Sequence, residues 1–296
     1  MTLSLVIPLA LAVAAAYLVM SLHAAVPPRL TAWLLVLVGS ATAISGAWLL
    51  VSLSLAFLGQ QRRLDRWLGW CDDLVANHDV VAAPLGWAAI GGVVLTSIAA
   101  TRTVRRYRNA WQPSLSGDPI EVVDDARVIA HAIPPRHGSD GTVILSTGLI
   151  AALDANELRA VMAHERSHLT HRHHRFLVSI DVAAAIVPLV RPLRAHIRLA
   201  TERWADEDAA ARVCSRHVVA TAVARAALAT APDAYSLGMS GSSTVARVSA
   251  LLEPRVLRSP LRMVTAIGSS AMAAAALVAT MVQIHHAFGL FAHICT

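Results

Sequence analysis

The chain contains no lysine, and charged residues of all kinds make up only 15% of its 296 positions. Its 25 basic residues are therefore all arginine, which we attribute to the codon usage of a GC-rich genome. Aromatic residues amount to 5%, and they do not interleave with basic residues as they do on nucleic-acid-binding surfaces. The net charge of +6 is therefore weak support for a nucleic-acid ligand, and we expect no direct nucleic-acid partner.

Cysteine is scarce as well, with only Cys71, Cys214 and Cys295. The three residues form no C-x-x-C pair and are too few for a disulfide-stabilised scaffold, which excludes the small secreted disulfide folds. We expect Cys214 to be a small buried apolar residue. If a membrane topology places Cys71 and Cys295 together on the oxidising side, a disulfide between them becomes a hypothesis.

Apolar residues are abundant instead, at 56% of the chain, and the mean hydropathy is positive. This composition is too apolar for an ordinary soluble domain and fits a membrane protein with one soluble module. Residues 176–190 form a short apolar run that contains Asp181, so we expect a buried or interfacial helix there. Longer uncharged runs predict four transmembrane helices, at 3–22, 30–58, 80–101 and 263–284.

Arginines near the ends of these runs predict the orientation. Four follow the third run within residues 102–108, and three precede the fourth run within residues 255–262. By the positive-inside rule, the module at 102–262 lies in the cytoplasm, and both termini lie outside the plasma membrane, with residues 285–296 as a short extracytoplasmic tail. The arginine pair at 62–63 argues for the opposite orientation and is outweighed. The expected fold is therefore mainly α-helical.

A H-E-x-x-H motif gives the module its chemistry. Residues four apart share one face of a helix, so His164 and His168 can present two imidazoles to one ion. Glu165 can hold a water that zinc activates and take its proton. The alternative is a solvated, histidine-rich helix, because the chain has 14 histidines and the motif also arises by chance.

The context of the motif favours the catalytic interpretation. Asp154, followed three residues later by Glu157, predicts a capping box at a helix start, and apolar residues then recur at helical spacing. A strand before this helix could hold an extended peptide by backbone pairing, as a protease requires. The β-branched run that predicts this substrate edge strand consists of Thr142, Val143, Ile144, Leu145 and Ser146.

A catalytic zinc site needs a third protein ligand and an open position for water. Glu202 and Asp206 are four apart, so one can bind the metal while the other accepts a hydrogen bond from a ligand histidine. Both could instead simply solvate a polar helix face. Although His171 shares a face with His164, it lies about 10 Å further along the helix, so we prefer Glu202. The histidines that compete for the ligand role are His171, His173 and His174.

Taken in order, these motifs resemble those of the gluzincin membrane proteases. Two branches are close over roughly residues 100–260. One is the HtpX and CAAX-protease group, and the other is the metalloprotease domain of β-lactam-sensing antirepressors of the BlaR/MecR type. The resemblance implies a zincin-type α+β module between the third and fourth transmembrane helices. The matching segments read T-V-I-L-S-T-G-L at 142–149, E-L-R-A-V at 157–161, H-E-x-x-H at 164–168 and E-x-x-A-D at 202–206.

The resemblance also implies roles for single residues. Arg247, in the pattern R-V-x-x-L, matches a basic position late in these domains. It could contact the transition state, although a structural role is the alternative that we favour. The other residues with an implied role are the Zn²⁺ ligands His164, His168 and Glu202, the general base Glu165, and Asp206 as hydrogen-bond partner of a ligand histidine.

Three spans before the module and one after it match the antirepressor branch better than HtpX, which has two on each side. That branch continues into an extracytoplasmic penicillin-binding sensor, which we do not expect in this polypeptide. Our leading hypothesis is a zinc-dependent endopeptidase that cleaves a BlaI/MecI-like repressor. The alternatives are HtpX-like quality control of membrane proteins and a catalytically silent scaffold with structural zinc. Membrane lipids are expected partners, and a homodimer is left open.

Overall fold

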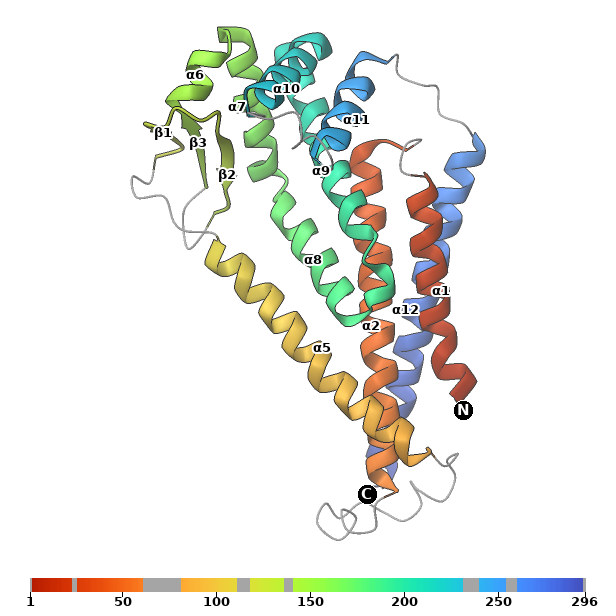
Figure 1. Cartoon of the computed structure of the whole chain (residues 1–296). Coiled ribbons are helices and arrows are strands. Elements are labelled where there is room, and N and C mark those ends of the chain that lie inside the picture. The colour runs from red at the N-terminus through yellow and green to blue at the C-terminus, as the bar shows by residue number, and fades with distance from the viewer. Residues whose placement is uncertain are drawn as a thin grey trace.

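The computed structural model describes residues 2–22, 26–60, 81–110, 118–135, 141–230, 240–253 and 260–294. The described chain is mostly helical, with one small sheet at the end away from both termini (Figure 1). Its elements are α1 (Thr2–Leu22), α2 (Pro28–Gly59), α5 (Ala83–Ala110), β1 (Ile120–Val123), β2 (Ala130–Ile133), β3 (Thr142–Ser146), α6 (Thr147–Ala152), α7 (Ala155–Thr170), α8 (His173–Ile186), η1 (Pro188–Val190), α9 (Leu193–Val213), α10 (Arg216–Thr230), α11 (Ser240–Leu252) and α12 (Pro260–Ile294).

Four helices, α1, α2, α5 and α12, are long and apolar enough to cross a membrane, as the uncharged runs predict. Two of them extend well beyond a predicted end. Helix α5 continues through residues 102–108, because arginine favours a helix and gives no signal to stop it. Helix α12 continues to Ile294, so most of the segment expected as a tail is helical. Cys71 and Cys295 lie outside the described residues.

Helix α8, the turn η1 and the first half of α9 form a hairpin that packs into the bundle of spans (Figure 1). Two glycines of α2 make room for it. A Cβ added at Gly39 would lie 2.6 Å from Ile180, and one at Gly46 would lie 2.5 Å from Val187. The short apolar run at 176–190 is therefore a helix with a 3₁₀ turn whose buried side chains Phe176, Ile180 and Val190 share one core with α1, α2 and α12.

One largely buried acid, Asp181, holds this hairpin against the third span. Asp181 of α8 accepts a hydrogen bond of 2.5 Å from the hydroxyl of Tyr107 on α5. Arg194 of α9 pairs with the same carboxylate at 2.8 Å, and Arg198 lies 3.6 Å from it. A charge among apolar helices is tolerated when it is paired in this way, so the network explains the polar interruption of the run.

The sheet has the strand order β1-β3-β2, with β1 parallel and β2 antiparallel to β3. The expectation that Thr142–Ser146 forms the substrate edge is therefore wrong, because β3 is the central strand. Its continuous burial fits a strand that is paired on both sides. In the sheet formed by the described residues, β2 is an edge.

The expectation for Cys214 is also wrong, since this residue lies exposed after α9.

Candidate metal centre and active site

Helix α7 carries the H-E-x-x-H motif and begins with the expected capping box. The Asp154 carboxylate accepts hydrogen bonds from the backbone N–H groups of Asn156 and Glu157. Glu157 in turn accepts a hydrogen bond from the Asp154 N–H. The same Glu157 carboxylate pairs at 2.8 Å with Arg225 of α10 and is only 3% exposed. The cap therefore fixes both the start of α7 and the position of the neighbouring helix α10.

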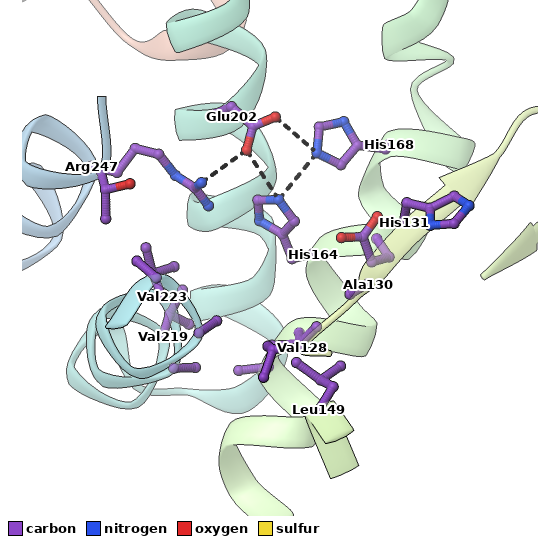
Figure 2. Close-up of a pocket in the computed structure, with 17 residues that line it drawn as sticks. Val128, Ala130, His131, Leu149, His164, His168, Glu202, Val219, Val223 and Arg247 are labelled. Carbon is purple, nitrogen blue, oxygen red and sulfur yellow. Dashed lines mark hydrogen bonds and ion pairs between the residues drawn. The ribbon is translucent and has the colours of Figure 1, made fainter. Parts of the chain in front are cut away.

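Three candidate ligands converge from α7 and α9 (Figure 2). The Nε2 atoms of His164 and His168 lie 3.1 Å apart. Glu202 of α9 places one carboxylate oxygen 3.4 Å from Nε2 of His164 and the other 3.6 Å from Nε2 of His168. Two imidazole nitrogens and one carboxylate oxygen facing a common point are the donor set of a catalytic zinc site. The residues present therefore fit a zinc ion.

Asp206, one turn after Glu202 on α9, lies behind the first ligand. Its Oδ1 atom is 2.9 Å from Nδ1 of His164, and the residue is 1% exposed. An acceptor on Nδ1 fixes the proton there and leaves the Nε2 lone pair free for a metal. The i, i+4 spacing of Glu202 and Asp206 thus gives them the two roles that the resemblance implies.

Arg247 of α11 is held by both carboxylates. It donates to the two oxygens of Asp206, at 2.8 Å from Nε and 2.7 Å from Nη2, and its Nη1 lies 3.0 Å from Glu202. The bidentate contact with Asp206 is strong and directional, and the guanidinium compensates both the buried charge of Asp206 and the partly exposed charge of Glu202. Because the guanidinium is engaged in this way, the structure favours an anchoring role for Arg247 over direct contact with a transition state.

Without a bound metal, the three candidate ligands differ in their pKa values and therefore in their charge. Burial lowers the pKa of His164, but its hydrogen bonds to Asp206 and Glu202 outweigh burial and raise the pKa to about 10. Burial and the neighbouring charge of His164 lower the pKa of His168 to about 4. Burial would raise the pKa of Glu202, but the hydrogen bond from His164 and the charges of His164 and Arg247 hold it below its usual range. One ligand proton, on His164, must leave before metal binds.

Glu165 lies beside β2, next to the ligands but outside the ligand set. Burial raises the pKa of its carboxyl group, while the charge of His164 and a hydrogen bond from the backbone of Ala132 act in the opposite direction. A carboxylate in such a desolvated position accepts a proton more readily than an exposed one. Glu165 therefore has the position and the environment of a general base.

A cavity of about 440 Å³ opens in front of the ligands, with Glu165, Glu202 and Arg247 in its wall (Figure 2). Its remaining walls are largely apolar and come from β2, α6, α7 and α10. Sequence reasoning missed the contribution of α10, although alternating valine and alanine at helical spacing was a signal for an apolar face. The side chains of α10 in this wall are Val219, Ala222, Val223, Ala226 and Ala227.

The comparison with protein families agrees with this site. Residues 114–232 match the family model of Peptidase family M48. The chain carries an M48 peptidase domain. The matched segment runs from before β1 to the end of α10 and contains His164, Glu165, His168 and Glu202, whereas Arg247 lies beyond it. Neither a curated protein nor a solved structure matches the chain significantly. M48 domains belong to zinc metalloproteases, so the domain implies metalloprotease activity.

Proposed function

We propose that the protein is a multi-pass, zinc-dependent endopeptidase of the plasma membrane whose M48 domain cleaves protein substrates in the cytoplasm. One observation carries the proposal: three metal-binding atoms and Glu165 meet at one cavity. The cytoplasmic orientation is supported by the arginines at 102–108, which lie in the last part of α5, just before the M48 match begins.

The residues divide the chemistry among themselves. Zinc held by His164, His168 and Glu202 would polarise the scissile carbonyl and lower the pKa of the attacking water. Glu165 takes the proton of that water and passes it to the leaving amide nitrogen. Arg247 holds one carboxylate oxygen of Glu202, so that the ligand keeps its place when charge develops in the cavity.

The edge strand β2 offers backbone groups to an extended peptide. Ala132 is opposite Val143, and the Val143 N–H donates to Pro119 on the β1 side of β3. Two residues that lie opposite each other in an antiparallel pair either hydrogen-bond to each other or both point their backbone groups away from each other. The backbone N–H of Val143 points toward β1, so the backbone groups of Ala132, and likewise those of Ala130, point away from β3. The Glu165 carboxylate already accepts a hydrogen bond from the backbone of Ala132, so a substrate strand that pairs with the remaining groups of β2 would run beside Glu165.

The walls of the cavity support a preference for apolar substrate side chains. The α10 face presents only valine and alanine to the cavity, and Val161 of α7 and Leu149 of α6 add to this apolar wall. Such a surface stabilises a buried apolar side chain by about 25 cal/mol per Å² and penalises an unpaired charge. We infer that the substrate carries a medium-sized apolar residue next to the scissile bond.

Two classes of substrate fit this site. A cytoplasmic repressor of the BlaI/MecI type is supported by the motif resemblance and by the three spans that precede the M48 domain. A damaged membrane protein, as in quality control, is supported by a different observation. The ligand helix α7 is followed, after a break at Arg172, by α8, which packs among the spans, so a short connection joins the metal site to the spanning bundle.

The test compares the full-length protein in native membranes with its Glu165→Gln variant. We expect about one zinc per chain in both proteins. Cleavage should fall by about 10²–10⁴-fold in the variant, because only the proton-transferring group is lost. Each protein is co-expressed with a BlaI-like repressor and, separately, with a misfolded multi-pass membrane protein, and the fragments are identified by mass spectrometry.

The outcomes separate the alternatives. Cleavage of the repressor at one bond supports the signalling class, and broad cleavage of the misfolded protein supports quality control. If wild-type protein binds zinc but both proteins leave every substrate intact, the catalytic proposal is wrong and the scaffold with structural zinc remains. A wild-type protein without zinc would overturn the metal site itself.

A further inference from the structure

The second ligand histidine has a partner that none of the sequence motifs assigns. Nδ1 of His168 lies 2.9 Å from Nδ1 of His173. The other ring nitrogen of His168 faces His164 and Glu202 at the metal site. The two ligand histidines are therefore supported differently, one by the carboxylate of Asp206 and the other by a second imidazole.

The contact depends on a break between α7 and α8. In a continuous helix, residues five apart differ by about 140° around the axis, so His168 and His173 would lie on different faces. Arg172 interrupts the helix with φ 53° and ψ 45°, a left-handed conformation that non-glycine residues rarely adopt. Helix α8 starts at the next residue, and its changed direction brings the His173 ring behind His168.

The surroundings of His173 are those of a buried aromatic side chain. It is 1% exposed, and its ring centroid lies 4.7 Å from that of Trp204 and 5.8 Å from that of His171. Its Nε2 is buried without a hydrogen-bond partner among the described residues. An apolar ring would fill this space without leaving a polar atom unpaired, which is costly. Packing alone therefore does not account for an imidazole here.

The positions of the ring protons explain why an imidazole is needed at position 173. A histidine that binds metal through Nε2 carries its proton on Nδ1, and this proton needs an acceptor. A neutral imidazole ring has one donor and one acceptor nitrogen, so His173 can supply that acceptor. With Nδ1 accepting from His168, the proton of His173 is on Nε2.

We propose that His173 is a positioning residue that accepts a hydrogen bond from Nδ1 of His168 and so fixes the ring orientation and tautomer in which His168 binds zinc. The inference rests on the metal site of the proposed function. It adds a residue outside the H-E-x-x-H motif on which metal affinity depends. His171, in the same aromatic cluster, instead pairs with Asp208 at 2.9 Å.

The test measures zinc affinity in the detergent-solubilised full-length protein by competition with a chromophoric chelator. His173→Phe keeps an aromatic ring but removes the acceptor, and we expect zinc affinity to fall by about 10–100-fold. The visible absorption spectrum of the Co²⁺-loaded variant should change as well. His173→Asn places an amide oxygen near the position of Nδ1 and should restore affinity to within about threefold of wild type. The matched control, His171→Phe, should stay within about twofold.

Several results would overturn the inference. Wild-type affinity in His173→Phe would show that the contact does not support the ligand. An equal loss in His171→Phe or His173→Asn would assign the effect to general packing. If His173→Phe does not fold, judged by thermal unfolding of the metal-free protein, His173→Leu takes its place under the same criteria. A wild-type protein without zinc would instead refute the proposed function, so the two failures are distinguishable.

Discussion

Two aspartates of this protein, Asp206 and the slightly more exposed Asp181, are paired in the same way but serve different parts of the structure. Asp206 pairs with Arg247 and directs its other contact to the ligand His164. Asp181 pairs with Arg194 and directs its other contact to Tyr107 of a membrane span. In each case an arginine compensates the charge of the aspartate, and the other contact of the aspartate, His164 or Tyr107, determines the role of the network. One network orders a metal ligand, while the other joins α5 to the α8–α9 hairpin.

The two networks also differ in their access to solvent. The Arg247 side chain is 16% exposed, whereas that of Arg194 is 40% exposed. Breaking a buried pair leaves an uncompensated charge, while solvent can replace part of a half-exposed one. We therefore expect the Asp206 network to be the more sensitive of the two to substitution, and its loss to be visible first in metal binding.

The largest effect should follow from Asp206→Asn. This change removes the charge that supports His164 and leaves Arg247 with one carboxylate, so we expect zinc affinity to fall by about 10–100-fold. Metal competition titrations measure the loss. Asp208→Asn is the matched control on the same helix, because Asp208 contacts Ser167 and His171 but neither of the two ligand rings. Equal losses in the two variants would contradict the comparison.

Local signals explain how much of this site could be predicted from the sequence. The capping box at Asp154 and the i, i+4 spacings of His164 with His168 and of Glu202 with Asp206 depend only on helix geometry, which short-range patterns specify. The four long apolar helices follow from hydropathy in the same way. Sequence therefore predicted both the elements that carry the ligands and the spacing within them.

The remaining features depend on long-range pairing. Whether Thr142–Ser146 is an edge or a central strand is decided by β1 and β2, two four-residue strands whose patterns are too short to reveal their partners. The contact of His173 depends on a left-handed arginine at position 172, and no residue type there signals a break. Likewise, no local pattern predicts that Gly39 and Gly46 admit α8 to the bundle.

A change in pH should have a smaller, graded effect on zinc affinity. In the metal-free protein the pKa of His164 is raised to about 10, so its pairing with Asp206 contributes stability that is fully present below pH 6.5 and lost as the pH rises through 10. Zinc must displace this proton, so the apparent zinc affinity should rise about tenfold per pH unit between pH 7 and 9. The slope should flatten in Asp206→Asn, in which the supporting charge is absent. A wild-type affinity independent of pH in this window would contradict the assignment.

The smallest effect should follow from Tyr107→Phe, which tests the second network without touching the first. The variant loses one hydrogen bond to a charged acceptor, and the free energy of unfolding should fall by about 1.5–3 kcal/mol, measured by denaturant titration in detergent. Zinc affinity should remain within about twofold of wild type, because no ligand contact changes. Tyr17→Phe is the matched control, since the Tyr17 hydroxyl donates to the neutral carbonyl of Leu189 in the same hairpin at 3.1 Å. Its loss should be smaller, about 0.5–1.5 kcal/mol. A loss of zinc in Tyr107→Phe would mean that the hairpin transmits strain to α7, and the two networks would then have to be treated as one coupled unit.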